Sequence, residues 1–260
     1  MASLTSSVPQ GTVTEFIQRF GRFGGSEELI RRLNGDDELM RIWTEELVER
    51  VESSARLFTT PADQLTQIQQ WNKDNNWGFT EKHFSALGAP PELPANAGKL
   101  VTVVLVPYLG NKNGVLGFLR TFNELWKLAA AQQENSWRWE GYDNPDNLRL
   151  LEGIKHPGKK LRWEIIDLGA NWDKKNGIAP KDVRNPETSP HAAILAAAAL
   201  HPDWPRAMDG KEVPYAWIPG YQVSVPGDVP WQDVPHFYWL RGDHEVRLGY
   251  GWDGSRYYSW

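Results

Sequence analysis

The side chains best suited to acid/base chemistry stand where the sequence predicts that strands end and a helix begins. Tyr108 follows a first predicted strand, Asp167 ends a second, and His191 opens the next helix. In an open parallel sheet, ligands bind beyond the carboxyl ends of the strands. We therefore predict that Tyr108, Asp167 and His191 meet there as catalytic acid and base groups.

Polar and aromatic residues in the neighbouring loops are expected to hold a ligand beside this set. Asn171 would orient the ligand, Trp172 would stack on it, and Asn111 and Tyr221 lie in the other two strand-end loops. The helix that starts at His191 would also favour an anion, through its free N–H groups and its dipole.

Each predicted catalytic residue also has a structural interpretation, which the sequence leaves open. Asp167 can cap a neighbouring loop, as residues at strand ends often do. His191 can face solvent in a first helical turn. Tyr108 can be an aromatic side chain packed in the core.

A second titratable cluster surrounds the predicted C-terminal hairpin. It consists of His236, Asp243, His244 and Glu245. Mixed His and carboxylate side chains bind divalent metals, but these four lack the spacing of a known ligand set. Exposed turns are commonly rich in such residues. We therefore predict no metal site and no cofactor.

Tryptophan is the one strong deviation in composition, with fourteen in the chain. Trp77, Trp137 and Trp139 stand in polar surroundings, where a fully buried indole is harder to arrange. An exposed indole beside polar groups binds sugar rings and bases by stacking. These three are our candidates for ligand contact, and the alternative is that they fasten loops to the core.

Composition and charge restrict the possible partners. The chain has 33 acidic and 28 basic side chains, a net charge of −5 and no long block of either sign. Nucleic-acid binding is disfavoured, because phosphate neutralisation needs clustered Lys and Arg. The longest apolar run, residues 192–200, is far shorter than the roughly 20 residues of a membrane span.

The expected location is the cytoplasm. The chain contains no cysteine, and its first residues have neither a basic start nor an apolar run typical of a secretion signal.

The elements that must position the site predict a mixed α/β (α+β) fold. Residues 1–90 read as a helical region, and the proline-rich segment 90–98 reads as a linker before an α/β domain over residues 99–260; the alternative is that the two pack as one unit. Strands at 100–106, 161–168 and 213–218 alternate with helices at 116–133 and 191–200, which predicts a small, mostly parallel sheet with crossover helices. Strands at 234–240, 245–252 and 256–260 predict a C-terminal antiparallel meander.

Several segments carry a resemblance to other proteins. They are VVLVPYL at residues 103–109, SWRW at 136–139, LRLLEGI at 148–154, LRWEIIDLGAN at 161–171, SPHAA at 189–193 and WIPGY at 217–221. From about residue 57 onward the chain resembles uncharacterised hypothetical proteins of candidate-phylum bacteria. This resemblance implies no activity and assigns no functional residue.

The absence of common catalytic motifs favours a binding function. The chain has no nucleophile elbow, P-loop, dinucleotide fingerprint, zincin motif or EF-hand loop. We predict a soluble binding or interaction protein with aromatic recognition surfaces, whose small-molecule or protein partner is left open.

The alternative is a metal-independent hydrolase that acts on a glycan or another polar small molecule. It would use Asp167 and His191, with Glu164 as a further acid/base group. Asp167 and Glu164 are three positions apart on one strand, so their side chains point to opposite faces. A third class, a subunit of a larger assembly, would show an exposed apolar stripe along Leu39, Trp43 and Leu47.

Overall fold

The computed structural model describes residues 57–169, 179–185, 191–208 and 213–254, together with isolated residues between 26 and 41. The chain divides into two compact units, residues 1–56 and residues 57–260. The second unit contains the elements described below. The proline-rich segment 90–98 lies within the second unit, which contains residues on both sides of the predicted linker. The apolar stripe along Leu39, Trp43 and Leu47 lies outside the described residues.

A first sheet consists of two long strands, β1 (Val101–Tyr108) and β4 (Lys160–Asp167). They pair antiparallel along their whole length, from Val101 opposite Asp167 to Tyr108 opposite Lys160. Seven of the eight residues of β1 are buried. The predicted strand at 100–106 is therefore present and covered on both faces, but its partner is antiparallel.

Helix α4 (Pro61–Asp74) closes the free edge of β1. Its start is fixed by the Thr60 hydroxyl, which accepts a hydrogen bond from the Asp63 N–H, and by the proline that follows this cap. One turn later, the buried side chain of Gln64 pairs with the edge of the strand. Its Nε2 donates to the Val103 carbonyl (2.9 Å), and its Oε1 accepts from the Leu105 N–H (2.8 Å).

The second sheet is mostly antiparallel. Its strands follow the order β2 (Asn135–Arg138), β8 (Glu245–Trp252), β7 (Asp233–Leu240), β6 (Tyr221–Val223) and β3 (Leu148–Leu150), and β5 (Ala216–Trp217) pairs with β7. Among the described strands, only β2 and β8 pair in parallel.

The predicted mostly parallel sheet is therefore wrong. After β1 and the helix that follows it, the chain enters the second sheet through β2, and returns to β1 only with β4. The C-terminal hairpin of β7 and β8 is antiparallel, as the alternating pattern predicts. The second neighbour of β8 is β2, and the predicted last strand at 256–260 lies outside the described residues.

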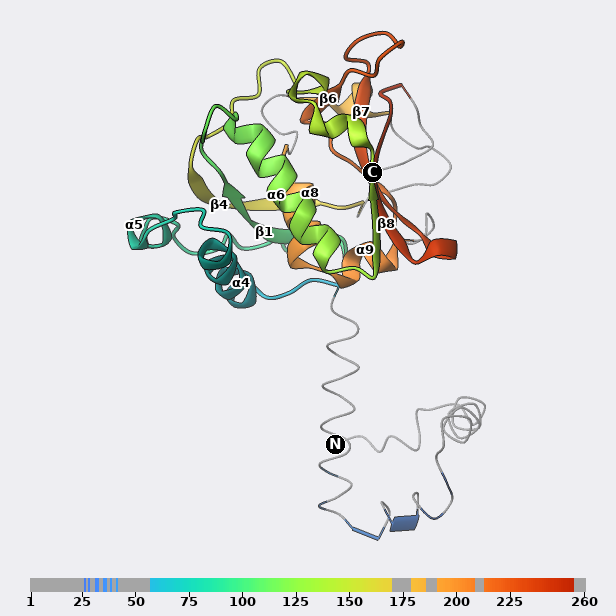
Figure 1. The fold of residues 1–260 in the computed structure, drawn as a ribbon. Helices are drawn as coiled ribbons and strands as arrows, with labels where there is room; N and C mark the ends of the chain where they lie inside the picture. The colour runs from blue at the N-terminus through green and yellow to red at the C-terminus, as the bar shows by residue number, and fades with distance from the viewer. Residues whose placement is uncertain are drawn as a thin grey trace. The chain divides into compact units, whose positions relative to one another are not determined.

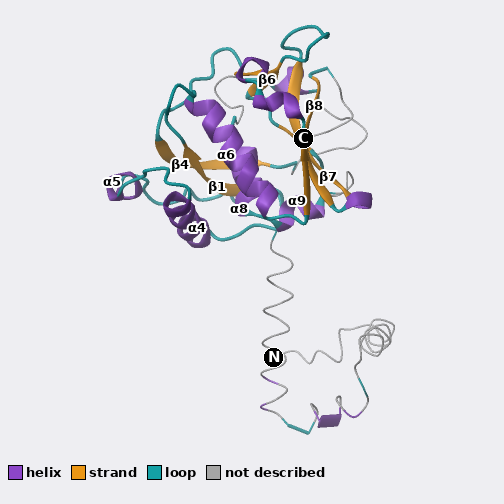
Figure 2. Ribbon diagram, in the orientation of Figure 1, coloured by secondary structure: helices purple, strands orange, loops and turns teal. Residues whose placement is uncertain are grey.

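Helices α6 (Gly117–Ala131), α8 (Ala193–Leu200) and α9 (Asp203–Ala207) pack against the strands of the two sheets (Figures 1 and 2). Helix α8 is buried along its whole length and packs against β1, β4 and α6. Helix α9 follows it and stacks Trp204 on Phe237 of β7, with ring centroids 5.9 Å apart. The remaining short elements are α5 (Glu81–Ser85), α7 (Pro180–Val183), and the 3-10 turns η2 (Glu140–Asp143), η3 (Pro145–Asn147) and η4 (Arg241–Asp243).

Helices and sheets together confirm the mixed α/β class. None of the helices in the described part of the chain is long and apolar enough to cross a membrane.

Candidate functional site

The last residue of β1 forms a short hydrogen bond with a carboxylate of β4. Tyr108 Oη donates to Glu164 Oε1 at 2.5 Å. The antiparallel register puts Tyr108 on the same face as Lys160, and strand alternation puts Arg162 and Glu164 on that face as well. Arg162 Nε lies 3.7 Å from the same Glu164 oxygen, and its side chain is 59% exposed against 14% for Glu164. Tyr108, Glu164 and Arg162 therefore form a row that extends from the core to the surface.

Burial sets the protonation of this pair. It raises the pKa of Glu164, and the Tyr108 hydrogen bond and the Arg162 charge oppose the rise only in part. Burial also raises the pKa of Tyr108 well above its usual range, so the phenol stays protonated and donates. Glu164 consequently keeps its proton to a higher pH than an exposed glutamate does.

His191 packs against the other side of Tyr108. The two ring centroids are 4.8 Å apart, and the rings are tilted by 33°. Burial lowers the pKa of His191 to about 4, with smaller contributions from His156 and Arg162, so the imidazole is neutral at pH 7. The His191 and Tyr221 rings are neighbours, with centroids 6.0 Å apart. Within the described part of the chain, neither His191 Nε2 nor the buried hydroxyl of Tyr221 has a hydrogen-bond partner.

His156, a second histidine whose ring contacts Tyr108 and His191, has a structural role. Its Nδ1 accepts the Gly158 N–H (3.1 Å), so its proton is on Nε2, which lies 3.2 Å from Thr121 Oγ1. The Thr121 hydroxyl also accepts the Leu109 N–H and donates to the Gly117 carbonyl. Every group in this network has a consistent role, and burial lowers the pKa of His156.

The structure brings together Tyr108 and His191 but not Asp167. Tyr108 and Asp167 lie at opposite ends of the β1–β4 ladder, seven residues or roughly 23 Å apart, and on opposite faces. Asp167 is exposed and accepts the Gly169 N–H at 2.8 Å. The predicted set of three is not formed, because antiparallel strands end at opposite edges. Glu164 supplies the carboxyl group instead.

Of the predicted ligand-holding residues, Tyr221 joins the cluster from β6. Asn111 caps α6, since its Oδ1 accepts the Gly117 N–H at 2.7 Å. Asn171 and Trp172 lie outside the described residues.

Two of the predicted aromatic contacts pack against other side chains of the protein. Trp77 is 5% exposed, and its Nε1 points to Glu124 Oε2 at 3.5 Å. Trp139 is half-buried between Tyr142 and Tyr250, with ring centroids 5.1 and 4.5 Å away. Both have the anchoring role that the alternative interpretation describes.

Trp137 of β2 is the exposed member of the three. It is 43% exposed, and the Arg247 guanidinium lies 5.7 Å from its ring centroid. Trp252, at the end of β8, is 56% exposed and has Lys181 5.6 Å from its ring.

The described residues contain no group of three metal-ligating side chains. In the hairpin cluster, His236 is buried against Trp217, while Asp243 and Glu245 form ion pairs with Arg247.

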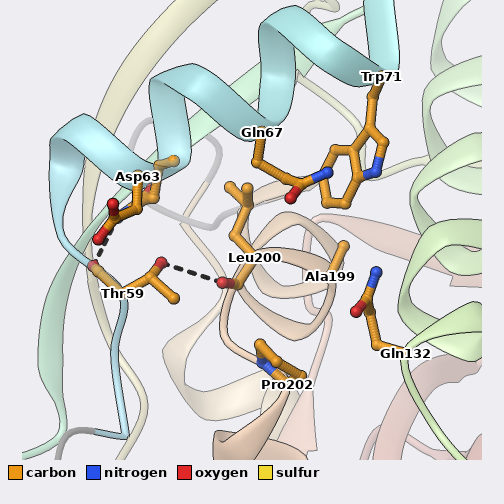
Figure 3. A pocket seen from close by; sticks show the side chains of 9 residues that line it. Thr59, Asp63, Gln67, Trp71, Gln132, Ala199, Leu200 and Pro202 are labelled. Atoms are coloured by element: carbon orange, nitrogen blue, oxygen red, sulfur yellow. Dashed lines mark hydrogen bonds between the residues drawn. The ribbon is translucent and has the colours of Figure 1, made fainter. Parts of the chain in front are cut away.

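A cavity of about 160 Å³ opens at the other end of α8, between that helix and α4 (Figure 3). Its lining consists of Thr59, Asp63, Gln64, Gln67, Trp71, Gln132, Ala199, Leu200 and Pro202. The Thr59 hydroxyl donates to the Leu200 carbonyl and so closes the last turn of the helix. The cavity is smaller than the roughly 300 Å³ at which small-molecule sites begin.

No family model, curated protein or solved structure matches the chain. The candidate functional site of this chain is the cluster of Tyr108, Glu164, His191 and Tyr221, with Arg162 at its rim.

Proposed function

We propose that the protein is an enzyme that hydrolyses a polar small molecule by general acid–base catalysis, without a metal. Glu164 acts as the general acid, His191 as the general base, and Tyr108 holds the Glu164 carboxyl in place. One observation carries the proposal: the buried polar atoms of His191 and Tyr221 lie unpartnered, among the described residues, beside a carboxyl group whose pKa is raised. Such groups are costly to bury, and they cluster at functional sites.

The environments of the two residues assign their roles. His191 is neutral at pH 7, because burial lowers its pKa to about 4, so an unprotonated nitrogen is free to accept a proton from water. The resulting hydroxide attacks the electrophilic centre, and the bond to the leaving group breaks. Glu164 then gives its proton to the leaving oxygen. Environments that push two pKa values apart are typical of acid/base pairs.

Hydrolysis of nitrophenyl esters, phosphate esters and glycosides tests the proposal. We expect the E164Q and H191N variants to lose turnover by a factor on the order of 100 or more. The matched control is H201N, because His201 is equally buried, has a pKa lowered to about 4 and lies at the far end of α8. The proposal fails if the wild-type chain hydrolyses none of these compounds, or if E164Q and H191N turn over as fast as H201N.

A second candidate function is recognition of a ring-bearing ligand at Trp137. The observation that favours it is the exposure of this indole beside Arg247, which offers stacking and hydrogen bonds on one surface. A glycan array probed with the wild-type chain and with W137A tests it, with the buried Trp77 (W77F) as the control. Equal binding by W137A and the wild-type chain would contradict this function.

A further inference from the structure

The N-terminal end of α8 is buried and uncapped. Its cap residue, Ala192, offers no side-chain hydrogen bond, and the first backbone bond of the helix joins the Ala196 N–H to the Ala192 carbonyl. The N–H groups of Ala193, Ile194 and Leu195 have no partner in the described part of the chain, and all three residues are 0% exposed. A helix start normally satisfies these groups by a side chain, water or a ligand.

Two unpartnered polar side chains adjoin this helix start. His191 directly precedes the cap residue, is 7% exposed and has a free Nε2 within the described chain. Tyr221, whose ring contacts His191, is 0% exposed and has a free hydroxyl. The Tyr221 hydroxyl can donate a hydrogen bond, and His191 Nε2 donates in the tautomer that carries its proton there, which leaves Nδ1 as the nitrogen that accepts a proton in the proposed hydrolysis.

A cation stands at the rim of the same cluster. The Arg162 guanidinium has a long contact, 3.7 Å, with Glu164, and more than half of its side chain is exposed. Its charge reaches the buried rings, because it lowers the pKa of both Tyr108 and His191. Burial raises the pKa of the neighbouring Glu164, which favours the uncharged form of that carboxyl group.

We propose that the N-terminal end of α8, together with His191, Tyr221 and Arg162, binds an anionic group, a phosphate or a carboxylate, of the small molecule on which this site acts. This inference rests on the proposed function, because it names the substrate class of the same site. Free N–H groups and the positive end of the helix dipole favour an anion, and a guanidinium binds either group through paired hydrogen bonds. An anion bound here would also raise the pKa of His191 from about 4 and make it a stronger base.

Titration of the full-length chain with inorganic phosphate and with acetate, followed by NMR, tests the inference. We expect saturable shifts of the His191 ring signals and of the Ala193, Ile194 and Leu195 amides, with no shift at His201. Acetamide is the neutral control, and sodium chloride at equal ionic strength is the control for salt. A stronger response to phosphate identifies a phosphate-bearing substrate, and a stronger response to acetate identifies a carboxylate.

Substitutions test whether the anion binds at this site or is attracted by positive charge anywhere on the surface. We expect R162Q and Y221F to weaken binding about tenfold, the loss of one hydrogen bond to a charged group. The matched control is R206Q, which removes a half-exposed arginine of α9 and should leave the affinity unchanged. The inference is overturned if neither anion shifts His191, if chloride does so equally, or if R162Q and R206Q behave alike.

The E164Q variant distinguishes the two proposals. We expect it to bind the anion and to lose turnover. Anion binding by a chain without turnover would refute the proposed function and keep the anion site. If the chain hydrolyses neutral substrates and neither phosphate nor acetate inhibits this hydrolysis, the anion site is refuted and the catalytic function stands.

Discussion

Acid should destabilise this protein strongly, because three of its histidines are buried in neutral form. They are His191, His201 and His236, which are 7%, 1% and 6% exposed. Burial lowers the pKa of each from 6.5 to about 4. Below pH 6.5 the unfolded chain therefore binds protons that the folded chain does not. The stability that these residues contribute is complete above pH 6.5 and is lost as the pH falls toward 4.

The expected loss is large. At pH 5 each of the three histidines removes about 2 kcal/mol, so together they remove about 6 kcal/mol. That is a substantial share of the roughly 5–15 kcal/mol that holds a typical protein folded. Glu164 and Asp233 act in the opposite direction, because their pKa values are raised and they bind protons more tightly in the folded chain. The net loss should therefore be smaller, at several kcal/mol.

Urea unfolding at pH 7.5 and at pH 5.0 measures this loss as the difference in the free energy of unfolding. The H201Q variant should reduce the difference by about 2 kcal/mol. The control is H244N, which replaces an exposed histidine at a positive φ of 49° with a residue that tolerates this backbone. An unchanged free energy between the two pH values, or the full pH dependence in H201Q, would refute the reasoning.

Three further substitutions test the elements that position the site. Q64L should lower the free energy of unfolding by roughly 2–6 kcal/mol, since it leaves two buried backbone groups of β1 unpaired. The control Q69L, at an exposed position of α4, should change it by less than about 0.5 kcal/mol, and urea unfolding measures both. G117A should cost about 1–3 kcal/mol in a thermal melt, because its Cβ would lie 2.5 Å from a carbonyl oxygen; an unchanged Tm would contradict the packing. Y108F should raise the pKa of Glu164 further, by removing the hydrogen bond that stabilises its charged form, and carboxyl NMR should show the titration move to higher pH rather than lower.

Local signals in the sequence predicted the elements of this fold better than their pairing. The Thr60 cap, the buried strand of β1 and the hairpin of β7 and β8 each follow from residues close together in the chain. The direction of a strand's partner does not. A strand covered on both faces has the same apolar pattern whether its partner is parallel or antiparallel, so the buried run of β1 favoured the wrong sheet.

The same ambiguity explains the error in the candidate site. Tyr108, His191 and Tyr221 were predicted to lie near one another, and their rings are in contact. The prediction of Asp167 depends on its place at the end of its strand, which brings it near Tyr108 only if β1 and β4 run in parallel. In the antiparallel ladder, the carboxyl group that reaches Tyr108 belongs to a residue inside β4, Glu164. Its position on the same face as Arg162 is visible in the sequence, but its neighbour across the ladder is not.

The two ends of α8 show why its start, rather than its end, is the better place for a ligand. A helix whose residues are all buried must satisfy both of its ends inside the protein. At the end of α8, the Thr59 hydroxyl donates to the Leu200 carbonyl, and the Thr59 N–H donates to Nδ1 of the following His201. At the start, no described residue accepts a hydrogen bond from the N–H groups of Ala193, Ile194 or Leu195. The last carbonyl of the helix therefore has a partner within the protein, whereas the helix start offers three N–H groups to a bound anion.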